Sequence, residues 1–290
     1  MPKPTMTDQK YLLKQQYKDS SNLRARIQLH RQYSTNTYDW TRWVFDFLSL
    51  IPENAHLLEV GCGPCDLWLA NLHRIPLEWE IVLSDMSPGM LEAAQNLLVD
   101  RAERFTFKEF DAQSIPFEDK TFDAVVANHM LYHLPDLDAG LSELRRVLKP
   151  QGRLFAATNG SRHMAELGEL RAKFFQFRQA ELGTRDAKGS DPTGSNSESS
   201  AMGFRLAFTM QNGEEVLGKY FSQVSLRRYE DALKITAVQP LFDYMMSSLR
   251  FFDFDDVAQR TLYSFLEEEM VASGGTIHIA KEAGLFQATR

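Results

Sequence analysis

The feature that most constrains the fold is an alternation of short apolar runs with longer segments of helical period between residues 57 and 157. We predict strands at Leu57–Val60, Ile81–Leu83, Phe105–Phe107, Ala124–Ala127 and Arg153–Ala157. Strands that are buried on both faces and alternate with helices form a parallel sheet with right-handed crossovers. The sequence therefore predicts an α/β fold with a mostly parallel sheet.

The flanking segments predict further elements around this sheet. Residues 10–50 and 239–272 have helical character, and residues 220–229 are expected to form a strand. Residues 276–280 and 285–289 are expected to form a terminal antiparallel hairpin that turns at residues 282–284. Residues 184–203 are rich in Ser, Gly, Asp and Asn, which is typical of a flexible loop. These boundaries predict three parts: a helical cap (1–50), a core domain (51–159 with 216–290) and an insertion or lid (160–215).

Composition excludes several classes of protein. With 43 % hydrophobic and 24 % charged residues, the chain is typical of a soluble globular protein. The formal charge of −7 argues against nucleic acid as a partner. No apolar run is long enough for a membrane span, and the polar start, Met1 to Ser20, does not resemble a signal peptide. Two cysteines predict no disulfide framework, and we expect a cytoplasmic protein, monomeric or homodimeric, with no membrane partner.

A glycine-rich segment, Glu59-Val60-Gly61-Cys62-Gly63-Pro64-Cys65, follows the first predicted strand. Glycine permits a sharp bend and a close approach of a ligand to the backbone, and ligands of open α/β sheets bind at this edge. A dinucleotide site would need a third glycine at the position of Asp66, where an anion is unfavourable next to a pyrophosphate. A redox site would use the C-x-x-C of residues 62–65, but thioredoxin-like folds are much smaller than this chain.

The third interpretation is a pocket for S-adenosylmethionine (SAM), which has no phosphate and carries an ammonium group. Glu59 is placed to meet that ammonium group, and Asp85, at the end of the second strand, to hold the ribose hydroxyls. Asp85 could instead cap the next helix, but Ser87, followed by Pro88, suits that role better. The two carboxylates favour the SAM pocket over the other two interpretations.

Residues 57–157 resemble the class I SAM-dependent methyltransferases, in particular the type-11 group that includes menaquinone and ubiquinone methylases. The resemblance rests on four segments in order: LLEVGCGPCDLWLANL, VLSDMSPGMLEAAQ, FKEFDAQSIPFEDKTFDAVVANHMLYHLPD and LRRVLKPQGRLF. It implies a Rossmann-like three-layer sandwich, here with a seven-stranded sheet. The chain departs from the family at Cys65, where a third glycine is usual. A weaker similarity of the flanks to bacterial small-molecule methyltransferases would place Tyr33 in a cap over the cofactor.

The resemblance implies which residues would bind the cofactor. Glu59, Gly61 and Gly63 would contact its methionine part, Asp85 the ribose, and Met86 the side of the adenine. Asp111 would accept from the adenine amino group, with Ala112 and Gln113 beside it. Asn128 would approach the amine and the methyl group. The full expected set is Tyr33, Glu59, Gly61, Gly63, Asp85, Met86, Asp111, Ala112, Gln113 and Asn128.

The expected chemistry is transfer of the methyl group to a small-molecule acceptor, which requires alignment and sometimes a base. His133 and His129 follow the fourth strand and are the candidate catalytic bases, since unperturbed imidazoles titrate in a useful range. His30 is a further candidate. No spacing of Asp, Asn and His suggests a metal site, so no metal is expected. A SAM-binding protein without methyl transfer and a C-x-x-C redox protein remain the alternatives.

Overall fold

The computed structural model describes residues 7–9, 21–182, 206–248 and 254–290. Its sheet has seven strands in the order β3-β2-β1-β4-β5-β7-β6. They are β1 (His56–Val60), β2 (Glu80–Asp85), β3 (Phe105–Glu109), β4 (Phe122–Asn128), β5 (Leu148–Asn159), β6 (Ser222–Ile235) and β7 (Ile277–Thr289). β1 to β5 are parallel, whereas β7 runs antiparallel to both β5 and β6. The predicted mostly parallel sheet with antiparallel C-terminal strands is confirmed.

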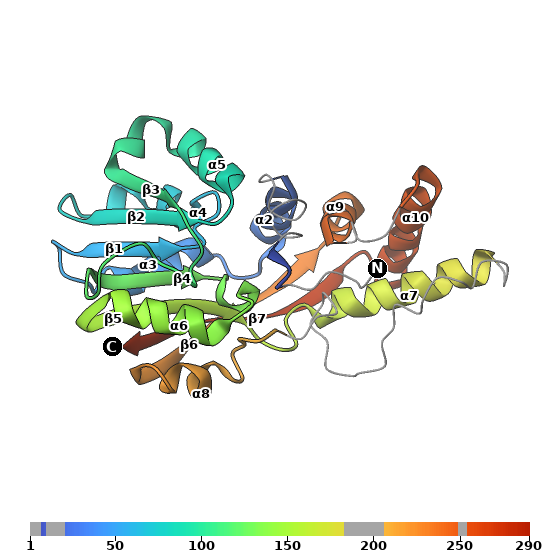
Figure 1. The fold of residues 1–290 in the computed structure, drawn as a ribbon. Coiled ribbons are helices and arrows are strands. Elements are labelled where there is room, and N and C mark those ends of the chain that lie inside the picture. Colours follow the sequence, from blue (N-terminus) through green and yellow to red (C-terminus); the bar gives the residue numbers. More distant parts are fainter. Residues whose placement is uncertain (1–6, 10–20, 183–205, 249–253) are drawn as a thin grey trace.

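Helices cover both faces of the sheet, as Figure 1 shows. One apolar cluster joins the sheet to α3 (Trp40–Leu48), α4 (Asp66–Leu69) and α5 (Pro88–Leu98). A second cluster joins the other face to α6 (Leu137–Val147) and α8 (Gly213–Gly218). Fully buried Trp68 and Phe155 lie in the first cluster, and Leu144 and Phe286 in the second. The three-layer sandwich is therefore built by two cores on either side of one sheet.

A third apolar cluster surrounds the part of β6 and β7 that extends past the neighbouring strands of the sheet (Figure 1). Its helices are α2 (Ser21–Tyr33), α7 (Ala165–Leu182), α9 (Val238–Ser248) and α10 (Asp256–Ala272). The helical segment expected over residues 10–50 is thus divided within its described part, because residues 34–39 separate α2 from α3. The loop predicted at 184–203 lies outside the described residues. In the part of the chain that is described, no helix is both long and apolar enough to cross a membrane.

The C-terminal strands differ from the sequence prediction in one respect. The predicted turn at residues 282–284 is wrong: these residues lie inside the continuous strand β7, whose antiparallel partner is β6, a strand separated from it by α9 and α10. Gly284 occupies a close approach instead of a turn, because a Cβ there would lie 2.8 Å from the carbonyl oxygen of Arg227. Positive φ angles occur instead at Gly274 and Gly275, which connect α10 to β7.

Candidate functional site

The glycine segment forms a loop between β1 and α4 at the carboxyl edge of the sheet. Gly61 has a φ of +66°, and a Cβ on it would lie 2.8 Å from the Cβ of Met130. Cys65 also adopts a left-handed conformation, with a φ of +64°, at the N-cap of α4. That conformation costs a non-glycine residue about 1–2 kcal/mol. The departure from the family's glycine at Cys65 therefore places a strained residue in the loop.

Asp85 ties this loop to the end of β2. Its Oδ2 accepts from the backbone N–H of Gly63 at 3.0 Å, and its Oδ1 accepts from that of Ser87 at 2.8 Å. Burial raises the pKa of Asp85, although these backbone hydrogen bonds partly offset the effect. Ser87 itself caps α5, because its side chain accepts from Met90 N at 3.3 Å. The predicted cap is confirmed, and the Asp85 carboxylate faces the loop.

Glu59 is a buried carboxylate near the end of β1, with only 2 % of its surface exposed. Its Oε2 accepts a hydrogen bond from the indole nitrogen of Trp68. Burial raises the pKa of Glu59 to about 8, the Trp68 hydrogen bond opposes that shift, and the charges of Asp85 and Asp66 add to it. A cation beside Glu59 would favour the ionised carboxylate, so the position suits a ligand that carries a positive charge.

The end of β3 leads into a turn that is held by hydrogen bonds. Asp111 accepts from both the backbone and the side-chain nitrogen of Gln113, at 2.9 to 3.0 Å. The side chain of Gln9 also donates to Asp111, at 2.7 Å, so the described N-terminal residues reach this edge of the sheet. Ala112 is 6 % exposed, and the Gln113 amide oxygen accepts from Asp136 N at the start of α6.

The end of β4 carries two polar side chains with unusual surroundings. The Asn128 Oδ1 is buried and has no hydrogen-bond partner among the described residues. His129 has a φ of +56°, and its ring lies 5.1 Å from that of Trp40. Burial, and then the charges of Lys281 and His133, lower the pKa of His129 to about 4. His129 is therefore not an unperturbed imidazole, because burial shifts its pKa, and its role as a base remains a prediction.

The remaining predicted residues lie on two sides of this edge. Met86, directly after β2, is partly buried, and its backbone N–H donates to Asp85. His133 ends a short 3-10 turn (Leu131–His133), with its ring 4.6 Å from that of Tyr132. Tyr33 is 8 % exposed and packs in the third apolar cluster, so its predicted cofactor contact remains a prediction.

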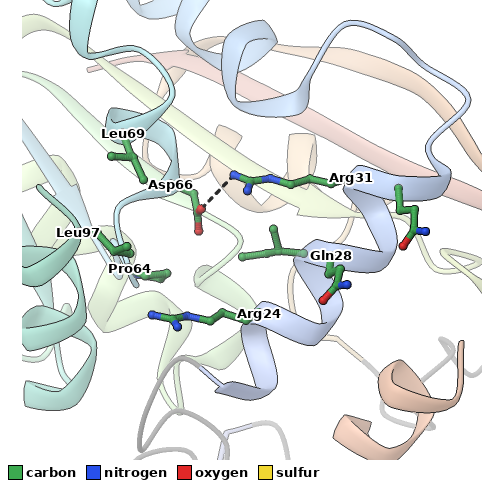
Figure 2. Close-up of a pocket in the computed structure, with 9 residues that line it drawn as sticks. Arg24, Gln28, Arg31, Pro64, Asp66, Leu69 and Leu97 are labelled. Atoms are coloured by element: carbon green, nitrogen blue, oxygen red, sulfur yellow. Dashed lines mark ion pairs between the residues drawn. The ribbon is translucent and has the colours of Figure 1, made fainter. Parts of the chain in front are cut away.

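The cap helix α2 faces the glycine loop across a cleft of about 490 Å³. Figure 2 shows Arg24 and Arg31 reaching from α2 toward Pro64 and Asp66, and Gln28 also lines the cleft. The guanidinium of Arg31 lies 3.7 Å from the Asp66 carboxylate. Since Arg31 is largely exposed, we expect this ion pair to orient the helix more than to stabilise the fold.

A buried ion pair that the sequence does not indicate lies close to this edge. The ammonium group of Lys281, on β7, donates to the carboxylate of Asp231, on β6, and their side chains are 9 % and 0 % exposed. His163, with a pKa lowered to about 3 mainly by burial, lies near the same lysine. The pair depends on the register between β6 and β7, in which the two residues face each other. Such a register leaves no local signal in the sequence.

Both thiols of the C-x-x-C segment are unpaired and buried, with exposures of 8 % for Cys62 and 0 % for Cys65. The contact with the Cys65 thiol, followed by burial, raises the pKa of Cys62 well above its ordinary value. Redox-active cysteines instead have lowered pKa values and accessible sulfur atoms. The geometry therefore disfavours the redox interpretation of this segment.

We expect both thiols to react slowly with Ellman's reagent in the folded protein, at least about tenfold more slowly than after unfolding in urea. Replacing Cys62 and Cys65 together by serine should leave the affinity for S-adenosylhomocysteine within about threefold of the wild type, since Ser hydroxyls can also donate to Gly63 O. Rapid labelling of the native protein, or loss of activity only in the serine variant, would support the redox alternative.

Comparison with known proteins agrees with this arrangement. Residues 58–156 match the protein family described as a methyltransferase domain. This segment is similar to that domain. It resembles demethylmenaquinone methyltransferase of Lactiplantibacillus plantarum, with 36 % identity over 106 residues, or 36 % of this chain and 45 % of the relative. UbiE of Idiomarina loihiensis, a ubiquinone/menaquinone biosynthesis C-methyltransferase, is 32 % identical over 117 residues, or 40 % and 46 % of the two chains. The chain thus spans less than half the length of these curated relatives.

Solved structures share the fold of this chain, including elements outside residues 58–156. A putative methyltransferase from Bacillus halodurans superposes with a TM-score of 0.55 at 15 % identity, covering 86 % of this chain and 98 % of its own. Phosphoethanolamine N-methyltransferase 2 of Haemonchus contortus, in complex with S-adenosyl-L-methionine, gives 0.57 at 16 %, covering 99 % and 60 %. The [4+2]-cyclase SpnF gives 0.54 at 17 %, covering 100 % and 98 %. These similarities confirm the Rossmann-like fold, and the presence of a cyclase among them means that the fold alone does not define the reaction.

Proposed function

We propose that this chain is a SAM-dependent methyltransferase that acts on a small-molecule acceptor. The observation that carries the proposal is a pair of carboxylates, the buried Glu59 and the half-buried Asp85, that flank a loop with no room for a Cβ at Gly61. A buried Glu59 with a raised pKa suits a cationic ligand group, and the methyltransferase domain spans both carboxylates. The net charge of −7 supports a small acceptor over a nucleic acid.

The residues present fit this cofactor. Glu59 would meet its ammonium group, with the Trp68 indole fixing the carboxylate. The backbone N–H groups of Gly63, Ser87 and Met86 do not exhaust the lone pairs of the two Asp85 oxygens, so a ribose hydroxyl can still donate there. Asp111 is held by Gln113 and would accept from the adenine, with Ala112 and Met86 near the ring. When bound, SAM would supply a methyl group carried on its sulfonium sulfur. The acceptor's electron pair forms the new bond to the methyl carbon, the C–S bond breaks, and its electrons stay on sulfur.

The protein's own task is then to orient the acceptor, exclude water and hold any proton that it loses. We propose Asn128, at the end of β4, as the residue nearest the methyl group. His133 is the stronger candidate for a base, because a pKa of about 4 makes His129 a weak one. At neutral pH, His129 is uncharged and is suited to hydrogen bonding with an acceptor.

The test is incubation of the purified protein with methyl-labelled SAM and a metabolite extract, followed by separation of small molecules. Label on a small molecule supports methyl transfer. Tight binding of S-adenosylhomocysteine without label on any acceptor would favour a SAM-binding protein that uses the cofactor without transferring the methyl group. Absence of binding would contradict both.

Replacing Asp85 by asparagine should weaken the binding of S-adenosylhomocysteine by about 1–3 kcal/mol, the value of charge-assisted hydrogen bonds to the ribose hydroxyls. Calorimetry measures this directly. Asp119→Asn is a matched control, because that carboxylate is 65 % exposed and pairs with Arg146 away from the carboxyl edge of the sheet. An Asp85→Asn protein with wild-type affinity would remove Asp85 from the site.

A further inference from the structure

A group of buried polar side chains, which we name the cap-side cluster, lies where β4, β6 and β7 meet the helices α2 and α3. Its members are His30, Trp40, Asn128, His129, Tyr229 and Lys281. Ring centroids of Trp40 and His129 are 5.1 Å apart, and those of Trp40 and Tyr229 are 5.2 Å apart. The Lys281 Nζ lies 5.9 Å from the Tyr229 ring centroid, and its charge acts on both His30 and His129. Five separate elements thus bring these side chains together.

The cluster contains hydrogen-bonding atoms that the protein does not satisfy. In the part of the chain that the structure describes, four buried side-chain nitrogen or oxygen atoms have no partner. They are His30 Nδ1, Trp40 Nε1, Asn128 Oδ1 and His129 Nδ1, and every one belongs to the cap-side cluster. A buried polar atom without a partner costs about 1–3 kcal/mol, so native proteins rarely gather several in one place unless a ligand pairs with them.

The charges of the cluster indicate what kind of ligand would pair with it. Lys281 is a buried ammonium group, and one of its N–H bonds is directed to Asp231. That carboxylate also accepts from the Ser34 hydroxyl and from Asn36 N at 3.0 Å, so its charge is shared among several donors. Burial and the Lys281 charge hold the pKa of His30 and of His129 below the ordinary value, so both imidazoles are neutral at pH 7. The Lys281 ammonium group and the Trp40 indole are donors, and each neutral imidazole can present a donor or an acceptor at Nδ1, whereas the Asn128 Oδ1 is an acceptor.

The cluster also adjoins the proposed cofactor site, because Asn128 belongs to both. A molecule in contact with Trp40 and His129 would be next to the residue that we place nearest the methyl group. The aromatic faces of Trp40 and Tyr229, with centroids 5.2 Å apart, offer an apolar wall for the rest of that molecule.

We propose that the cap-side cluster binds the methyl acceptor, and that the acceptor carries a carboxylate or another anionic oxygen group that accepts hydrogen bonds from Trp40 Nε1 and Lys281. This assignment rests on the proposed methyltransferase function and adds the chemical class of its acceptor. An anionic oxygen next to Lys281 and an indole N–H forms charge-assisted hydrogen bonds, which are stronger than those of a neutral amide.

The test uses matched carboxylate and carboxamide probes on the protein saturated with S-adenosylhomocysteine: benzoate with benzamide, phenylacetate with phenylacetamide, and indole-3-acetate with indole-3-acetamide. Dissociation constants come from saturation-transfer NMR. We expect carboxylates to bind at least about tenfold more tightly than the matching carboxamides, and Trp40→Phe to reduce that preference at least about fivefold. Phenylalanine keeps an aromatic ring at position 40 but removes the unpaired donor and part of the ring area, and the same change at Trp43 controls for the smaller ring. Circular dichroism and melting temperature verify that the variant folds.

Trp43→Phe is the matched control, because this neighbouring indole nitrogen is not among the four unpaired atoms. It should keep the carboxylate preference. Equal binding of carboxylates and carboxamides, failure of every probe to bind, or a Trp40→Phe protein with unchanged preference would overturn the assignment. Binding of S-adenosylhomocysteine is measured first: its absence contradicts the proposed function, whereas its presence without a carboxylate preference contradicts only the acceptor class.

Discussion

Replacing Glu59 by glutamine is expected to weaken the binding of S-adenosylhomocysteine at pH 8 by about 2 kcal/mol or more, roughly a thirtyfold loss of affinity. The reason is that the ligand's ammonium group loses a buried carboxylate partner. Glutamine has nearly the same shape as glutamate. Its amide oxygen can still accept from the Trp68 indole nitrogen, which donates to Glu59 in the wild type. The loss should therefore report the charge and not a collapsed loop, and calorimetry measures it.

The same substitution should stabilise the ligand-free protein. Burial raises the pKa of Glu59 from 4.5 to about 8, so the folded state binds this proton more tightly than the unfolded state. The free energy of unfolding therefore falls as the pH rises from about 4.5 to 8, and glutamine, which cannot ionise, avoids that fall. We expect the melting temperature of Glu59→Gln to exceed the wild-type value at pH 8. The increase should be roughly 2–4 °C for each kcal/mol of unfolding free energy that the wild type loses through ionisation of Glu59, with little difference at pH 4.5.

The pH dependence of binding provides a second measurement of this effect. Since the ligand's ammonium group requires an ionised Glu59, wild-type affinity should rise with pH between 6 and 8, by at most about tenfold per pH unit. The Glu59→Gln protein should show no such rise. Glu80→Gln is the control, because that side chain is 73 % exposed at the start of β2, the opposite end from Asp85. Wild-type affinity in Glu59→Gln would place the ammonium group elsewhere.

The central part of the fold could be predicted because its signals are local. β1 to β5 each coincide with an apolar run, and Ser87 with Pro88 marks the start of α5. The carboxyl ends of parallel strands meet at one edge of the sheet, so the sequence predicts that Glu59, Asp85 and Asn128 lie near one another there. Their pKa values were not predictable, because burial by Trp68 or Trp40 depends on how distant elements pack.

The C-terminal half could be predicted only in outline. The sequence predicts a strand at residues 220–229 and a hairpin of residues 276–280 and 285–289, but Gly284, which suggests a turn, has a close contact with Arg227 inside one continuous strand. Asp231 and Lys281 are fifty positions apart in the sequence and face each other only through the β6–β7 register. Nothing in the local sequence fixes that register, so the cap-side cluster could not be predicted.

Replacing Lys281 by methionine is expected to destabilise the protein by about 3–5 kcal/mol, because it leaves the fully buried carboxylate of Asp231 without its cation. Melting temperature and urea unfolding measure the change, which corresponds to a loss on the order of 10 °C. The pair Lys149 and Asp123 supplies the control: with exposures of 38 % and 27 %, Lys149→Met should cost no more than about 1 kcal/mol.

The destabilisation should depend on pH in a direction that identifies its cause. Burial alone would raise the pKa of Asp231, but hydrogen bonds from Lys281, Ser34 and Asn36 N lower it overall. The wild-type carboxylate therefore stabilises the fold above the unfolded pKa, and this contribution is lost as the pH falls through the folded pKa. Without Lys281 the pKa of Asp231 should rise, so the deficit of the variant should be largest at neutral pH and shrink in acid. A deficit independent of pH would indicate lost packing instead.

The double variant Lys281→Met with Asp231→Asn separates stability from recognition. Removing both charges eliminates the uncompensated ion, and replacing a buried ion pair by neutral groups is often close to neutral for stability. We expect the double variant to recover most of the free energy of unfolding that Lys281→Met loses, which gives a coupling energy of about 2 kcal/mol or more in a double-mutant cycle. Its preference for carboxylate over carboxamide probes should not recover, because the ammonium donor is still absent. A stable double variant that keeps the preference would show that the buried lysine serves the fold alone.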